Sequence, residues 1–540
     1  MITALLLACV TEVPREPGVV VVVQEQQASW VRNFNPFAPT SSRWPTSSGV
    51  YEPLMVMNAA TGEWVPWLAT DYGWNEDGTE LTFTIRDGVK WSDGTPFEAH
   101  DVVDTFTLMK EHPGLDVGGT WSGLNRVALD GDQVVFTFDQ PSVTRLGAIA
   151  HTPIVPDHVW GELENPVVFA NEDPVATGPF TEVRLFRSQV FELGANPHYW
   201  QELGVEALRF PAVSSNEQAN LALIRGELDW AGMFVPAVDR TYIERDPQHY
   251  DAWFPTTGGT TFLYANTTVE PFDDPKVRKA LSLAIDRELL VEVAMYGYTT
   301  PSHPSGLSDG HASWRRDDLP DLVTRDLEEA GRLLDEAGLE MGPDGWRTNP
   351  DGSPLELEIT SPAGWSDWVR AIQVIAASLR EAGLDVRVAG RDFSAWYERL
   401  SRGDFELSLG WSQNGESPVA LYRPLMDPAY IQLIGEASFR NWQRFGDKRA
   451  GQLFEAYDRT PMREDQQVLV NELQDRFVET MPAIPLFPAP SWGESNHRHI
   501  TGFPSQDDPY ASLSPNDVPG VLLVMTSLDT RDTGLAQAAP

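Results

Sequence analysis

Apolar residues follow two different periods along the chain, and the period changes several times from that of a strand to that of a helix. Residues 19–23 are a continuous run of valine, which predicts a buried strand. Leu81, Phe83 and Ile85 alternate with polar residues, as in a half-buried strand. In the second half, the same patterns predict helices and strands in turn at 327–338, 355–359, 369–383, 384–388, 395–402 and 405–409. This alternation predicts an α/β fold with mostly parallel sheets.

The stretch from Thr257 to Leu307 connects two halves of the predicted fold. Residues 261–266 alternate like a strand, and Asp273 to Pro275 begin a helix, because proline is favoured in the first helical turn. The apolar positions of this helix fall on one face, at Val277, Ala280, Leu281, Ala284 and Ile285. A strand therefore ends one half of the chain and a helix opens the next.

Length and composition narrow the class of protein. A chain of 540 residues is too long for one ordinary hydrophobic core, which predicts two or three cores. The formal net charge is -40, so no nucleic-acid partner is expected, because phosphate binding needs a basic surface. Aromatic residues make up 10% of the chain and include 19 tryptophans, which suits a ligand-binding surface as well as a core.

The same connecting stretch resembles the crossing between the lobes of extracellular solute-binding proteins of ABC importers, family 5. The resemblance is carried by Thr261-Phe-Leu-Tyr-Ala-Asn266, Val277-Arg-Lys-Ala280 and Ala284-Ile-Asp-Arg287. Further family motifs follow one another in order at Leu81–Phe97, Thr177-Gly-Pro-Phe180, Asn196-Pro-His-Tyr-Trp200 and Gly226–Trp230. Because several ordered motifs match, the resemblance is specific, and it covers about residues 19–528.

This resemblance implies a two-lobe periplasmic-binding-protein type II (Venus-flytrap) fold with an extra subdomain in lobe one. We expect the divisions of the chain to be 1–18 for a truncated lipoprotein signal and tether, 19–262 for lobe one with a subdomain at about 45–190, 263–486 for lobe two, 487–528 for the return to lobe one, and 529–540 for a frayed tail. Two crossing strands are expected near 259–268 and 482–490.

The N-terminal residues Leu5-Leu-Leu-Ala-Cys9 resemble a lipobox, in which the cysteine is lipidated. Cys9 is also the single cysteine of the chain, which excludes an internal disulfide. No later run reaches the roughly 18 apolar residues of a spanning helix. We therefore expect an extracytoplasmic protein, in the periplasm or at the cell surface, that is anchored to the membrane by lipid alone.

The candidate ligand-binding residues are aromatic and polar side chains, several of them just after predicted strands. Ligands of parallel α/β sheets bind beyond the carboxyl ends of the strands, where Trp365 and Trp411 lie. The full set is Trp365, Asp367, Trp411, Asn414, Arg440, Asn441, Trp442, Arg32, Asn33 and Asn216. Trp365 and Asp367 resemble a stacking tryptophan and its polar partner in chito-oligosaccharide-binding members. Core packing remains an alternative for Trp411 and Trp442, a self-stabilised loop for Arg32 and Asn33, and a structural role for Asn216.

The choice between sugar and peptide depends on the segment after the strand at 405–409. Peptide binders of the family carry an aspartate after Gly-Trp, which pairs with the peptide ammonium, whereas this chain has neutral Asn414. A buried cation needs a counter-charge, so this asparagine favours a neutral polar ligand. Glu416 lies nearby in sequence and is an alternative source of the charge.

These observations predict that the protein captures an oligosaccharide, expected to be β-linked, for the membrane permease subunits of an ABC importer. An oligopeptide- or dipeptide-binding protein is the alternative, and a receptor that signals has the same fold. We expect no enzymatic activity, because no HExxH, Gly-x-Ser-x-Gly or Walker motif occurs. No cofactor and no metal are expected, since His497 and His499 fit a solvated loop, and the protein is expected to be a monomer.

Overall fold

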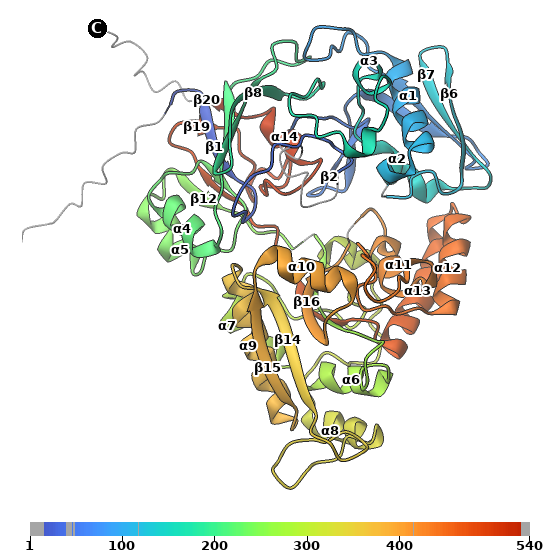
Figure 1. The fold of residues 1–540 in the computed structure, drawn as a ribbon, viewed down its shortest axis with the longest axis vertical. Coiled ribbons are helices and arrows are strands. Elements are labelled where there is room, and N and C mark those ends of the chain that lie inside the picture. Colours follow the sequence, from blue (N-terminus) through green and yellow to red (C-terminus); the bar gives the residue numbers. More distant parts are fainter. Residues whose placement is uncertain are drawn as a thin grey trace, which may run out of the picture.

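The computed structural model describes residues 16–38, 46, 49–116, 118–256, 258–413 and 415–530, and its ribbon forms two bodies that meet along one side (Figure 1). The N-terminal half forms the upper body, the segment from about residue 260 to 488 forms the lower body, and the C-terminal segment returns to the upper one. We call these bodies lobe one and lobe two. The predicted two-lobe α/β fold is thus confirmed.

Lobe one is built on a seven-stranded sheet in the order β12-β18-β11-β1-β10-β9-β8. Its strands are β1 (Val19–Val23), β8 (Phe180–Arg187), β9 (Val190–Ala195), β10 (Ala207–Pro211), β11 (Trp230–Ala231), β12 (Tyr250–Ala252) and β18 (Glu494–Asn496). The valine strand β1 lies parallel to both of its neighbours, β10 and β11, and is buried as predicted. Helices α4 (Asn216–Ile224), α5 (Val238–Thr241) and α14 (Val521–Met525) belong to the same lobe.

A further antiparallel unit of lobe one lies at the upper right of Figure 1. Its four-stranded sheet has the order β4-β5-β7-β6, and β2 and β3 form a separate hairpin. The strands are β2 (Met55–Asn58), β3 (Glu63–Pro66), β4 (Ala69–Trp74), β5 (Glu80–Ile85), β6 (Leu124–Asp130) and β7 (Gln133–Phe138), with helices α1 (Ala99–Glu111), α2 (Leu146–Ala150) and α3 (Asp157–Trp160). The alternation at Leu81, Phe83 and Ile85 buries these three side chains under α1.

Lobe two contains a five-stranded sheet in the order β15-β14-β16-β13-β17. Its strands are β13 (Thr260–Ala265), β14 (Glu356–Pro362), β15 (Asp385–Arg391), β16 (Leu407–Trp411) and β17 (Ile484–Pro488). The expected parallel pairing holds for β14 with β15 and β16, whereas β13 runs antiparallel to both β16 and β17. The antiparallel strand is the one through which the chain enters from lobe one.

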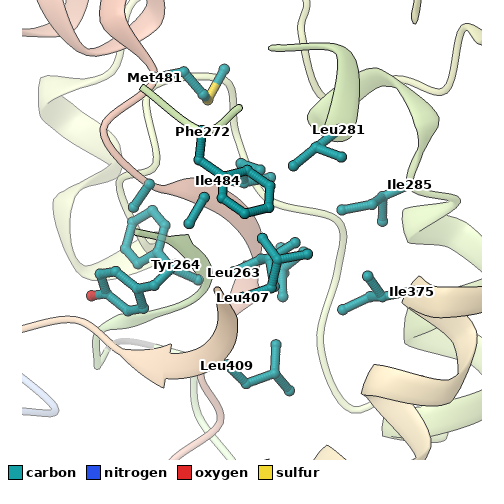
Figure 2. Close-up of a cluster of buried hydrophobic side chains, with 14 of the residues drawn as sticks. Leu263, Tyr264, Phe272, Leu281, Ile285, Ile375, Leu407, Leu409, Met481 and Ile484 are labelled. Carbon is teal, nitrogen blue, oxygen red and sulfur yellow. The ribbon is translucent and has the colours of Figure 1, made fainter. Parts of the chain in front are cut away.

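Helices pack against this sheet and complete the core of lobe two, part of which is drawn in Figure 2. They are α6 (Pro275–Ala284), α7 (Arg287–Met295), α8 (Leu327–Glu336), α9 (Ser366–Glu381), α10 (Phe393–Arg402), α11 (Pro418–Met426), α12 (Lys448–Asp458) and α13 (Arg463–Thr480). Asp274 caps α6 and Pro275 occupies its first turn, as the sequence predicts. The close-up shows Leu281 and Ile285 directed at the same core as Leu407.

The two arginines of the family motif stabilise the end of lobe two. Arg278 donates to the carbonyl oxygens of Met481 and Thr480, at 2.8 and 2.6 Å, and Arg287 donates to that of Pro485 at 2.8 Å. Both side chains are buried, so these carbonyls replace water around the charges. The motif therefore connects the start of lobe two to residues 480–485, after which the chain returns to lobe one.

The strand pairings show where the chain changes sheet. The first change lies between β12, which ends at Ala252, and β13, which begins at Thr260. The second lies between Pro488 of β17 and Glu494 of β18. The predicted lobe limits at 262 and 486, and the subdomain limits at 45 and 190, stay predictions. The small strands β19 (Ile500–Thr501) and β20 (Asp529–Thr530) pair with each other in lobe one, and residues 531–540 lie outside the described chain.

Candidate ligand-binding site

A cavity of about 190 Å³ lies between the lobes, next to the segments that cross between them. Lobe one and the returning segment contribute Glu25, Gln26, Asn216, Gly232, Met233, Phe234, Ala489, Pro490, Trp492 and Asn516. Lobe two contributes Thr261, Met295, Trp365, Asp367, Trp368, Trp411 and Phe487. The wall thus combines aromatic faces with amide and carboxyl groups, which is the usual composition of a small-molecule site.

The wall from lobe two is aromatic because two neighbouring strands end at it. β14 and β16 are parallel and adjacent, so Trp411 at the end of β16 lies near Trp365, which follows β14. The ring centroids of these two tryptophans are 6.1 Å apart, and their planes are inclined by 39°. Both side chains are half-buried. Trp368, one turn into α9, packs edge-on against Trp365 at 4.8 Å. Trp365 and Trp411 therefore lie at the predicted edge of the sheet and face the same cavity.

Trp442 lies behind this wall. It is 3% exposed, and its ring packs against Trp411 and Tyr264 at 5.3 Å from each. A side chain on Gly410 would bring its Cβ to 2.7 Å from the Tyr264 ring and 2.9 Å from the Trp442 ring, which explains the glycine before Trp411. The structure thus places Trp442 in the core that supports Trp411.

The wall from lobe one contains a second aromatic group. Phe234 and Trp492 line the cavity with their rings 5.5 Å apart, and Phe254 and Tyr298 pack against Trp492 at 5.0 and 6.0 Å. Phe234 follows β11 and Trp492 lies in the returning segment, so both accompany the change from one lobe to the other. Tyr298 belongs to lobe two, so this aromatic group also connects the two lobes.

Asn216 and Asp367 join the two lobes at the cavity. Asn216 Nδ2 of lobe one donates to Asp367 Oδ1 of lobe two at 3.2 Å, and Gln26 Nε2 donates to Asn216 Oδ1 at 2.7 Å. The backbone N–H of Asn216 donates to the Gly364 carbonyl at 3.0 Å. A Cβ on Gly364 would lie 2.6 Å from the Ser214 carbonyl, so a glycine allows the two backbones to come this close. The lobes are therefore closed onto each other in this structure.

Two carboxyl groups line the cavity, and burial raises the pKa of each. The pKa of Asp367 is raised to about 6, although backbone N–H groups, Asn216 and the charge of Arg370 act in the opposite direction. The pKa of Glu25 is raised to about 8 by burial. The Oε2 atom of Glu25 is buried and has no hydrogen-bond partner within the described part of the chain. The protein thus stabilises the ionised form of Asp367 with hydrogen bonds and a nearby charge, whereas Glu25 Oε2 has no partner among the described residues.

Arg32 and Asn33 are engaged in their own region of lobe one. Arg32 donates to Asp173 at 2.5 Å and to the Glu172 carbonyl at 3.0 Å, and Asn33 Oδ1 accepts from the backbone of Asn35 at 3.0 Å. Neither side chain is part of the described cavity wall. The alternative of a loop that stabilises itself fits these contacts.

Arg440 and Asn441 also lie away from the cavity wall. The Arg440 guanidinium stacks over Tyr430 at 5.1 Å and reaches the Gly118 carbonyl of lobe one at 3.4 Å. Asn441 has a positive φ of 50° and binds the backbone of Phe445 through both side-chain atoms. Asn441 therefore shapes a turn. Asn414 and Cys9 lie outside the described residues.

Glu416, the alternative counter-charge for a peptide, contacts a different part of lobe one. Its carboxylate accepts a hydrogen bond from Trp64 Nε1, and burial raises its pKa. The ring of Trp64 lies 4.8 Å from that of His151. Glu416 is thus engaged at a second contact between the lobes, and it is not part of the described cavity wall.

Several wall residues were not among the predicted ones. These are Glu25, Gln26, Met233, Phe234, Thr261, Met295, Trp368, Phe487, Trp492 and Asn516. Glu25 and Gln26 follow shortly after the buried strand β1. This position could have identified them as site residues, because ligands of such sheets bind beyond the carboxyl ends of the strands. Trp492 and Asn516 carry no comparable local signal, since their place depends on the return of the chain to lobe one.

The described residues contain no group of three or more His, Cys, Asp or Glu side chains that is arranged to hold a metal ion. Among the same residues, no helix combines the length and the apolar character that a membrane crossing requires.

The fold and the interlobe cavity define a solute-binding protein. The family model for bacterial extracellular solute-binding proteins, family 5, matches residues 63–431, which is more than half of the chain. The chain therefore belongs to this family, and the predicted resemblance is confirmed. Family members of this type bind solutes for ABC importers and are not enzymes, which agrees with the sequence prediction.

Similar proteins span most of the chain. Protein XP55 of Streptomyces lividans is 28% identical over 71% of this chain and 68% of its own length. The nickel-binding periplasmic protein of Escherichia coli is 25% identical, covering 84% of this chain and 88% of that protein. A periplasmic oligopeptide-binding protein from Thermotoga maritima, solved with mannohexaose bound, has a TM-score of 0.88 and 26% identity, covering 96% of this chain and 100% of that one.

Proposed function

We propose that this protein captures an oligosaccharide in the cavity between its lobes and delivers it to the membrane subunits of an ABC importer. The observation that carries the proposal is the pair of half-buried rings of Trp365 and Trp411 at the end of adjacent strands. Sugar rings have apolar faces that pack on indole, and each tryptophan can bury roughly 150–250 Å². The nearby amides of Gln26, Asn216 and Asn516 suit hydroxyl groups, because an amide both donates and accepts.

Capture depends on the closure of the lobes. A ligand between the walls contacts both lobes and stabilises the closed arrangement, whereas a ligand that touched one lobe would not shift the equilibrium. The Asn216–Asp367 bond forms only between approached lobes, so it adds to the same closed state. The mannohexaose bound to the similar Thermotoga maritima protein supports a sugar of several units as the cargo.

The proposal extends to localisation. We expect the protein outside the cytoplasm and attached to the membrane through a lipid on Cys9, because the residues before Cys9 resemble a lipobox. Metabolic labelling with a radioactive fatty acid would test this, with Cys9→Ala as the unlabelled control. Equal label in both proteins would remove the anchor from the proposal.

A peptide is the second candidate ligand. The carboxyl groups of Glu25 and Asp367 are suitable partners for a peptide ammonium, and similar proteins include the oligopeptide-binding protein OppA of Bacillus subtilis, which is 23% identical. We expect only one of these two ligand classes to bind tightly, because the two need different partners. A peptide needs partners for its backbone groups and its carboxylate, and a sugar needs them for its hydroxyl groups.

Isothermal titration calorimetry tests the proposal directly. The panel contains cello-, chito-, xylo- and manno-oligosaccharides beside peptides of two to five residues. Micromolar or tighter binding of one sugar series, with silent peptides, is the expected result. Tight binding of peptides with silent sugars would overturn the proposal in favour of the second candidate.

A further inference from the structure

Glu25 occupies a fixed position in the cavity wall, directly after β1. The neighbouring Gln24 donates from Nε2 to the Pro515 carbonyl at 3.1 Å, and its own carbonyl accepts from Asn516 Nδ2. The backbone that carries Glu25 is therefore attached to the C-terminal part of lobe one. Glu25 therefore lines the cavity from a segment that is held by hydrogen bonds to Pro515 and Asn516.

The two carboxyl groups of the cavity differ in the hydrogen bonds and nearby charges that stabilise them. Asp367 accepts from Asn216 at 3.2 Å and lies near the charge of Arg370, whose guanidinium stacks over Tyr296 at 5.3 Å. Glu25 Oε2 is buried without a hydrogen-bond partner in the described residues. A buried polar atom without a hydrogen-bond partner is unfavourable, so a group of the ligand is expected to provide that partner.

The charge around Glu25 indicates what that group is. The described cavity wall contains two acidic side chains and no lysine, arginine or histidine. An ionised carboxyl group in such a place is stable only beside a positive charge. Aromatic faces, here from Trp365, Trp411 and Phe234, also attract cations through their π electrons. A positively charged group on the ligand therefore interacts favourably with both the carboxyl groups and the aromatic rings of the cavity wall.

We propose that Glu25 pairs with a positively charged amino group of the ligand, so that the cargo is an oligosaccharide of amino sugars with free amines. This inference rests on the proposed function, and it narrows the substrate class of the same cavity. Because burial raises the pKa of Glu25 to about 8, most of the unliganded protein holds this carboxyl group protonated at pH 7. Pairing with an ammonium then releases the carboxyl proton to the buffer.

Three oligosaccharides of equal length provide a matched series. Cello-oligosaccharide, chito-oligosaccharide and fully deacetylated chito-oligosaccharide share the ring and the linkage, and they differ at C2 in a hydroxyl, an acetamido or an amino group. At pH 6, where the amines of the sugar are already protonated, and at physiological salt, we expect the deacetylated sugar to bind at least about tenfold more tightly than the other two, as charge-assisted hydrogen bonds exceed neutral ones. Calorimetry in two buffers with different ionisation enthalpies is expected to show proton release for this sugar alone.

The variant Glu25→Gln keeps the size of the side chain and removes its charge. We expect it to abolish both the preference for the amino sugar and the proton release. Glu76→Gln is the control, because Glu76 is exposed in a turn and its loss changes the net charge of -40 by the same amount. Circular dichroism melting establishes that both variants are folded.

The outcomes separate this inference from the function on which it rests. Equal binding of all three sugars, unchanged in Glu25→Gln, would overturn the role of Glu25 and leave oligosaccharide capture intact. If none of the three sugars binds but another sugar does, the amino-sugar assignment is overturned and oligosaccharide capture stands. If only a peptide binds, both the assignment and the proposed function are overturned. A preference for the amino sugar that Glu76→Gln weakens as much as Glu25→Gln would assign it to the overall negative charge instead.

Discussion

The two walls of the cavity differ in chemistry and in the way they are supported. Lobe two presents Trp365 and Trp411, backed by other aromatic rings such as Trp368, Trp396 and Trp442. Lobe one presents Glu25, Gln26 and Asn216, which reach the cavity from the end of β1 and the start of α4. Lobe two thus supplies the paired indole faces and one carboxyl group, Asp367, whereas lobe one supplies the amides, the second carboxyl group and the rings of Phe234 and Trp492.

The largest effect is expected from the support of the aromatic wall. Trp442→Ala removes a ring that is 3% exposed and leaves a cavity, so the free energy of unfolding should fall by about 3–5 kcal/mol. Urea denaturation measures this change. The exposed Trp346, which is 36% accessible, offers Trp346→Ala as a control with little effect. A Trp442→Ala protein as stable as the control would remove Trp442 from the core.

A smaller effect is expected from the face of the same wall. Trp365→Ala should weaken ligand binding by about 1–3 kcal/mol, because the ligand loses a buried indole face. The unfolding free energy should fall less than in Trp442→Ala, since Trp365 is only half-buried. Calorimetry with the sugar that binds best measures the affinity. Unchanged affinity in a folded variant would take Trp365 out of the site.

The buried acids of lobe one predict an unusual dependence of stability on pH. Burial raises the pKa of Glu25 to about 8 and those of Glu52 and Asp517 to about 7, from ordinary values of 4.5, 4.5 and 3.8. Between the two values the folded state holds protons that the unfolded chain has lost, so stability decreases as the pH rises toward 8. We therefore expect the free energy of unfolding to decrease steadily between pH 5 and pH 8.

Urea denaturation at a series of pH values measures this dependence. Glu25→Gln should reduce the slope above pH 7, because its side chain does not titrate. Stability that rises from pH 5 to pH 8 would contradict the assignment of these carboxyl groups as buried acids.

The smallest effect is expected from the bond that joins the walls. Asn216→Ala removes the donor to Asp367 and should weaken ligand binding by about 0.5–1.5 kcal/mol, because the closed state loses one hydrogen bond. Asn125→Ala is the matched control, since it removes an exposed 2.7 Å bond to Asp139 within lobe one. Calorimetry gives the affinity, and small-angle scattering reports closure. Equal affinity in both variants would show that the bond does not favour closure.

Local patterns were sufficient for the fold and for part of the site. The valine run at 19–23, the capped helix start at Asp274 and Pro275, and the strand that ends at Trp411 all follow from hydrophobic period and capping chemistry. Trp365 and Trp411 could be predicted to lie beyond the carboxyl ends of strands, and the structure adds that these two strands are adjacent. Whether Arg440 and Asn441 reach the cavity could not be predicted in this way, because polar residues in loops have no hydrophobic period that shows where their side chains point.

The sequence by itself determined the family, the succession of strands and helices, and the strand ends at which two of the tryptophans face the cavity. Only the tertiary structure decided that Glu25, Asp367 and Trp492 line one cavity, that Trp442 lies behind it, and that Glu416 contacts Trp64 instead. The physical reason is range. Hydrophobic period and caps act over a few residues, whereas the surroundings of a side chain depend on segments hundreds of residues away that pack against it.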